Sequence, residues 1–93
     1  MGAVRIGDVV FDHVVYDEGA DVLYLHVGDP STAVGFDESP EGHALRFDRS
    51  GHFVGVTIVG AGHAVHAGEH LSVTIPSRVE IDTDQVEAAI RAA

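Results

Sequence analysis

The chain has 93 residues, of which 45% are hydrophobic and 11 are glycine. This composition is too apolar for a disordered segment and too rich in glycine for a helical bundle, so it predicts one globular, strand-rich domain. The 15 acidic residues outweigh five arginines, giving a formal net charge of -10, and there is no lysine and no cysteine. These counts argue against nucleic-acid and anionic-membrane partners, and they exclude disulfides, thiolate metal sites and cysteine nucleophiles.

The start of the sequence and its apolar runs indicate a cytoplasmic protein. MGAVRIGDVVF lacks the charged and long apolar regions of a secretory signal. No apolar run reaches the ~18 residues that a membrane span requires. The use of arginine in place of lysine, together with abundant Ala, Gly and Val, is typical of a GC-rich bacterial genome.

A β-hairpin is predicted near the N-terminus. Residues 9–16 are β-branched and aromatic, and residues 21–27 form a second run of this kind. Between them, Asp17 and Gly19 have the chemistry of a turn, and Asp21 opens the second strand. In that strand Leu23, Leu25 and Val27 alternate onto one face, which we expect to be the core side.

A long connection and a second hairpin follow. Residues 28–42 are rich in proline and acidic residues, which predicts a loop that contains one short strand. The segment Asp48-Arg49-Ser50-Gly51 then matches a bulged hairpin loop, because Asp48 suits the first position of a type I turn and Gly51 suits the left-handed residue after it. The predicted strands of this region are residues 33–36, 43–47 and 52–59.

The C-terminal third is predicted to be a strand and a helix. Residues 70–75 alternate as a strand, which residues 79–81 extend past Pro76. Asp82 and Gln85 then stand at capping-box spacing ahead of apolar residues at helical spacing. The predicted fold is therefore α+β: an antiparallel sheet of about five strands, covered on one side by a short C-terminal helix.

Three segments together resemble a known family. Residues 16–25 (YDEGADVLYL), 47–51 (FDRSG) and 54–58 (VGVTI) resemble domain-of-unknown-function family 2283, over about residues 16–62. The resemblance implies a small β-rich domain of bacterial origin without an assigned activity, some members being candidate partners of small toxin-like proteins. After the last matched strand, members often carry an acidic residue where this chain has Gly60-Ala61-Gly62.

The segment VTIVGAGHAVHAGEH, residues 56–70, combines two functional signals. The first is Gly60-x-Gly62, which resembles the start of a dinucleotide-binding loop. Such a loop needs Gly or Ala at the next packing position, where this chain has Val65, and a parallel crossover needs about a dozen residues. The glycines are therefore interpreted as backbone requirements of a turn.

The second signal is a candidate metal site formed by His63, His66 and His70. On a helix these spacings would place three imidazoles on one face, where they could bind zinc, copper or nickel, with Glu69 as a further ligand. Gly68 predicts that any helix ends before His70, and the spacing matches no standard zinc arrangement. The alternative is a solvated polar corner. The remaining histidines are predicted at the surface or at strand rims: His13, His26, His43 and His52.

Hydrolytic chemistry has little support. Asp48, Ser50 and His52 belong to one tight turn, whereas catalytic triads are assembled from separate elements. The acid pairs Asp17 with Asp21 and Asp37 with Glu38 are expected to be solvated carboxylates.

Three hypotheses of function remain. The first is a non-enzymatic interaction module, a homodimer whose acidic surface binds a basic protein partner such as a toxin-like protein. The second is a metal- or small-ligand-binding protein that uses the His63, His66 and His70 corner. The third is an enzyme with an unrecognised carboxylate site, which would require a concave cleft lined by acids with perturbed pKa values.

Overall fold

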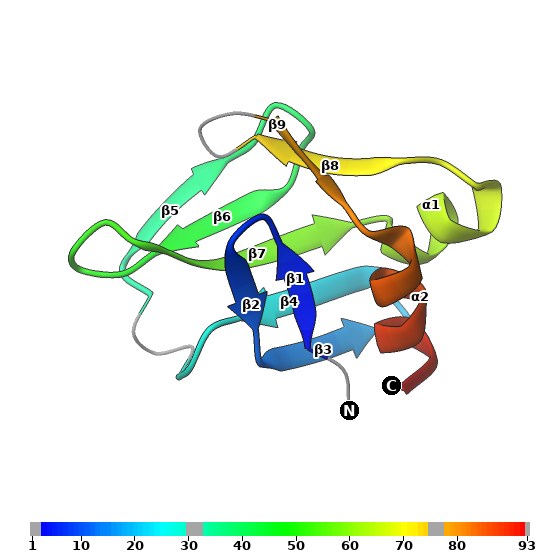
Figure 1. Cartoon of the computed structure of the whole chain (residues 1–93), viewed down its shortest axis with the longest axis horizontal. Coiled ribbons are helices and arrows are strands. Elements are labelled where there is room, and N and C mark those ends of the chain that lie inside the picture. Colours follow the sequence, from blue (N-terminus) through cyan, green and yellow to red (C-terminus); the bar gives the residue numbers. More distant parts are fainter. Residues whose placement is uncertain (1–2, 30–32, 75–77, 93) are drawn as a thin grey trace.

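The computed structural model describes residues 3–29, 33–74 and 78–92, which form nine strands and two helices (Figure 1). The strands are β1 (Val4–Ile6), β2 (Val9–Phe11), β3 (His13–Asp17), β4 (Val22–His26), β5 (Gly35–Glu38), β6 (Ala44–Phe47), β7 (Phe53–Val59), β8 (Leu71–Thr74) and β9 (Arg78–Ile81). The helices are α1 (Ala61–Ala67) and α2 (Thr83–Ala92). None of the helices in the described ranges is long and apolar enough to cross a membrane.

The centre of the fold is a five-stranded antiparallel sheet in the order β3-β4-β7-β6-β5. Together with the C-terminal helix α2 it confirms the predicted α+β class. Two further antiparallel pairs of strands, β1-β2 and β8-β9, form separate two-stranded sheets. The short strand predicted at residues 33–36 is present as β5, displaced by two residues.

Residues 9–16 were predicted to form one strand, and this prediction is wrong, because they belong to two strands, β2 and β3. The chain changes direction at Asp12, whose carboxylate accepts a hydrogen bond of 2.9 Å from the Gly28 backbone N–H. β2 therefore pairs with β1, a strand that was not predicted, and β3 pairs with β4.

The second hairpin confirms the predicted turn. The Asp48 carboxylate accepts hydrogen bonds of 2.9 Å from the backbone N–H groups of Ser50 and His52, and Gly51 has a φ of +85°. A bulge between Arg46 and Phe47 follows in β6, so Phe47 pairs with Phe53.

The C-terminal part confirms the helix and corrects the preceding strand. Rather than extending β8, β9 folds back to pair with it, so Leu71 lies opposite Ile81; Ile75 and Pro76 fall outside the described residues. The Asp82 carboxylate accepts from the Asp84 N–H at 2.9 Å, and the Gln85 side chain bonds both Asp82 and the Arg5 backbone N–H. This cap ties α2 to β1.

One face of the five-stranded sheet is covered by β1-β2, β8-β9 and α2 (Figure 1). Leu23 and Leu25 of β4 point into this core as predicted, with 0% and 2% of their surface exposed. The rest of the buried apolar core is drawn from every part of the chain: Val4, Ile6, Phe11, Leu45, Val56, Ile58, Ala61, Ala64, Leu71, Val73, Ile81, Val86 and Ala89.

Candidate functional site on the open face of the sheet

The second face of the five-stranded sheet carries exposed apolar side chains, and we call it the open face. Because side chains alternate along a strand, the residues next to the buried leucines in the sequence point away from the core. Val15, Tyr24, Phe36 and Val59 reach this face from β3, β4, β5 and β7, and they are 62%, 39%, 68% and 56% exposed.

A row of residues in register crosses the whole open face. His13 lies opposite His26, His26 opposite Gly55, Gly55 opposite Arg46, and Arg46 opposite Phe36. Gly55, at the centre of the row, is itself buried. A Cβ at this position would lie 2.8 Å from Cδ2 of His26 and 3.2 Å from the Leu25 carbonyl oxygen. Gly55 therefore leaves room for the His26 ring to lie against the sheet.

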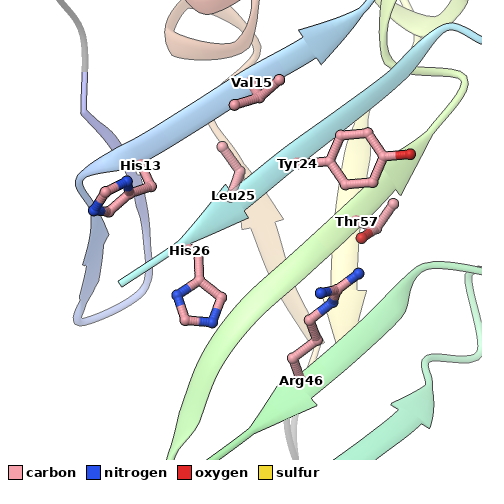
Figure 2. A pocket seen from close by; sticks show the side chains of 7 residues that line it. All are labelled: His13, Val15, Tyr24, Leu25, His26, Arg46 and Thr57. Atoms are coloured by element: carbon pink, nitrogen blue, oxygen red, sulfur yellow. The ribbon is translucent and has the colours of Figure 1, made fainter. Parts of the chain in front are cut away.

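A hollow of about 180 Å³ opens beside this row (Figure 2). It is lined by His13, Val15, Tyr24, Leu25, His26, Arg46 and Thr57. In Figure 2, His26 from β4 and Arg46 from β6 lie on either side of β7. Gly55 of β7 lies between these two large polar residues, and the register of the sheet therefore brings both to the hollow.

The polar groups of the hollow are incompletely paired. His26 is only 6% exposed, and neither of its ring nitrogens has a hydrogen-bond partner in the described part of the chain. His26 was predicted at the surface or at a strand rim; it lies at the end of β4, but it is buried. The Arg46 guanidinium lies 5.6 Å from the centre of the Phe36 ring, a cation–π contact. Buried polar groups normally find partners, so an unpaired imidazole marks a site that could accept a ligand.

The predicted metal residues are only partly brought together. His63 and His66 lie on α1, and Gly68 ends that helix with a φ of +69°, so His70 follows it as predicted. All three side chains are exposed. His63 and His70 line a second hollow of about 280 Å³, and His66 does not. Across the described ranges, no three histidine, aspartate or glutamate side chains are arranged to hold a metal ion.

The second hollow also contains Glu41, His43 and Glu69. Glu41 accepts hydrogen bonds from the Thr74 hydroxyl at 2.7 Å and backbone N–H at 3.1 Å, and the hydroxyl contact lowers the pKa of its carboxyl group. His43 is 5% exposed with an unpartnered Nδ1, and burial lowers its pKa. The prediction that His43 is a surface residue is wrong, because the loop before β6 turns it inward.

The turn residues of the first hairpin have a structural role. The Asp21 carboxylate accepts hydrogen bonds from the Tyr16 hydroxyl at 2.7 Å and from the backbone N–H groups of Gly62 at 2.7 Å and His63 at 3.0 Å. Asp21 has a φ of +54° and takes the left-handed conformation. Asp17 accepts from the Ala20 N–H at 3.2 Å. The Asp21 carboxylate of the hairpin thus caps the N-terminus of α1, although it belongs to a different element.

This cap also explains the two glycines of the corner. Gly60 has a φ of +74°, and a Cβ on Gly62 would lie 2.7 Å from both an Asp21 carboxylate oxygen and the Tyr16 hydroxyl oxygen. After α1 the chain enters β8, which pairs with β9 and does not lie beside β7 in the central sheet. The corner is therefore not a dinucleotide-binding crossover, and its glycines serve the helix start.

The comparisons with known proteins place the chain in a family. Residues 13–61, more than half of the chain, match the family model described as protein of unknown function DUF2283, so the chain belongs to this family. No curated protein and no solved structure matches it significantly. The matched segment contains all five strands of the central sheet, β3 to β7, and the Tyr16–Asp21 contact, so it includes every residue named above on the open face.

Proposed function

We propose that this domain is a non-enzymatic protein-interaction module that pairs with a second copy through the open face and presents its acidic remaining surface to a basic protein partner. The observation that carries the proposal is the set of exposed apolar side chains on one sheet face: Val15, Tyr24, Phe36 and Val59. An apolar patch on a small domain is typical of a contact surface, and sheet faces can stack with interdigitated side chains.

The distribution of charge favours a second copy as the occupant of this face. By alternation, the five strands place two carboxylates, Asp17 and Glu38, and one cation, Arg46, on the open face. The whole chain has a formal charge of -10, so most of its negative charge lies elsewhere. Two copies that meet through their open faces bring few like charges together, whereas contact through other surfaces would oppose many carboxylates.

The acidic remainder of the surface supports the second part of the proposal. A strongly negative domain attracts and orients a positively charged protein over several ångströms. The family resemblance to candidate partners of toxin-like proteins agrees with a basic partner. The effect of salt distinguishes the two contacts. Added salt strengthens self-association, because it screens the repulsion between acidic copies, and it weakens the attraction to a basic partner.

The test is sedimentation equilibrium of the purified domain and of variants with a glutamate in the apolar patch. Val15→Glu and Phe36→Glu should weaken self-association by about tenfold or more, because each places a charge in an apolar contact. Val10→Glu is the matched control, since Val10 is 50% exposed but lies on β2, outside the five-stranded sheet.

Two results would contradict the proposal. A wild-type domain that stays monomeric at its highest soluble concentration in high salt does not use the open face for a second copy. Equal weakening by Val10→Glu and Phe36→Glu would show that added charge, and not the open face, decides association. For the second contact, a partner that co-purifies from the native cell should be basic and should bind the purified domain less tightly as salt increases.

A further inference from the structure

The hollow on the open face has a polar lining that consists of potential hydrogen-bond donors. His13, Tyr24, His26, Arg46 and Thr57 line it, and no carboxylate does. This composition stands out in a chain with 15 acidic and five basic residues. An imidazole, a hydroxyl and a guanidinium can each donate an N–H or O–H, and a guanidinium can only donate. The lining therefore suits a ligand that accepts several hydrogen bonds.

His26 supplies an independent reason to expect a ligand here. Its side chain is more than nine-tenths buried, and both ring nitrogens are unpartnered within the described residues. Leaving such a group without a partner is unfavourable, and native structures rarely do so without a function. Gly55 leaves room for the ring, because a Cβ at this position would lie only 2.8 Å from Cδ2 of His26.

Arg46 is held in an orientation that leaves its donors available. Its guanidinium lies over the Phe36 ring, with Cζ 5.6 Å from the ring centre, and among the described residues it makes no ion pair. Stacking on an aromatic face leaves the N–H groups at the edge of the guanidinium free, and these match the two oxygens of a carboxylate. The nearby Asp12 carboxylate does not line the hollow and already accepts the Gly28 N–H.

We propose that the hollow binds a carboxylate group, with Arg46 as the main ion-pair partner and His26, Tyr24 and Thr57 as hydrogen-bond donors beside it. The volume of about 180 Å³ is below the roughly 300–1,000 Å³ of a typical drug-sized site. It fits a small carboxylate, with Val15 in contact with the apolar part. The same chemistry is offered by a free molecule and by an Asp or Glu side chain of a second copy on the open face.

The test for a free ligand is an NMR titration of the ¹⁵N-labelled domain with benzoate, benzamide and benzylamine at constant ionic strength. Benzoate should shift the amide signals of the residues that line the hollow, and its neutral and cationic analogues should bind at least about tenfold more weakly. Arg46→Gln and His26→Gln should weaken benzoate binding by about tenfold or more. Arg46→Lys should restore part of it, because lysine keeps the charge without the two-pronged geometry.

The matched control is Arg91→Gln, because Arg91 lies on α2, is 77% exposed and pairs with Glu87 at 3.4 Å. It removes the same charge without touching the hollow and should leave benzoate binding unchanged. Amide spectra of each variant show whether its fold is intact. If His26→Gln does not fold, the comparison of Arg46→Gln with Arg91→Gln still decides the result.

The second source is tested in the self-association assay. If the carboxylate belongs to a second copy, Asp17→Asn or Glu38→Gln should weaken the dimer as much as Arg46→Gln does, and benzoate should compete with it. The proposal would be overturned if benzoate and benzamide bind equally well. It would also be overturned if Arg46→Gln weakens neither benzoate binding nor self-association. A monomeric domain that still binds benzoate through Arg46 would contradict the open-face dimer and support the carboxylate site, so the two proposals fail separately.

Discussion

Replacing Asp21 tests whether one carboxylate joins the first hairpin to helix α1. Asp21→Ala removes an N-terminal cap, which costs about 1 kcal/mol, and the hydrogen bond from the Tyr16 hydroxyl to a charged group, which contributes about 1.5 kcal/mol at a partly exposed site. Alanine is also strained at a φ of +54°, by about 1 kcal/mol. The expected loss of unfolding free energy is therefore about 3.5 kcal/mol.

Two further substitutions at this position separate the contributions. Asp21→Gly removes the hydrogen bonds and tolerates the positive φ, so it should lose about 2.5 kcal/mol. Asp21→Asn tolerates the same backbone and keeps one acceptor oxygen, so it should lose about 1 kcal/mol. The expected order of stability is wild type, Asn, Gly, Ala.

The assay is urea unfolding followed by circular dichroism, with a double-mutant cycle between Tyr16→Phe and Asp21→Gly. The two changes should be coupled, because they remove the same hydrogen bond. An Asp21→Ala variant within about 0.5 kcal/mol of the wild type, or additive effects in the cycle, would refute the proposed cap.

The same contact gives a pH dependence with a fixed sign. The Tyr16 hydroxyl lowers the pKa of Asp21, so this carboxylate stabilises the fold above the pKa of an unfolded aspartate, and the contribution is lost as the pH falls through the folded value. The same hydrogen bond raises the pKa of Tyr16 to about 12, so its contribution is complete below the unfolded value of 10.0 and is lost as the pH rises toward 12. The difference in stability between wild type and Asp21→Asn should shrink at both extremes.

Three other outcomes are expected. Gly51→Val should destabilise the domain by about 1 to 3 kcal/mol in thermal unfolding, because a β-branched residue is strained at a φ of +85°; an unchanged melting temperature would contradict the turn. Burial lowers the pKa of His43, so its contribution to stability should be present above pH 6.5 and be lost as the pH falls below it, and a His43→Gln variant should lose less stability between pH 7 and pH 5. If His63, His66 and His70 are solvated, zinc, copper or nickel should raise the melting temperature of the metal-free domain by less than about one or two degrees. Stabilisation by several degrees at stoichiometric metal would establish the metal site, provided that it is absent from the variant with all three histidines changed to alanine.

The sequence determined the features that depend on neighbouring residues. Asp48 and Gly51 specify their turn because both hydrogen bonds of the Asp48 carboxylate go to backbone groups within four residues. Asp82 and Gln85 begin α2 in the same local way. Alternation placed Leu23 and Leu25 in the core, since the period of a strand is fixed by its geometry.

Only the tertiary structure decided the features that depend on distant partners. Asp12 ends β2 by bonding Gly28, 16 positions along the chain, and Asp21 caps α1 from 41 positions away. His26 is buried because Gly55 lies beside it on β7 and leaves room for its ring, which no pattern within β4 can reveal. Alternation divides a sheet into two faces, but which face is covered depends on where the remote segments β1, β9 and α2 pack, so the open face and its hollow emerged only from the assembled fold.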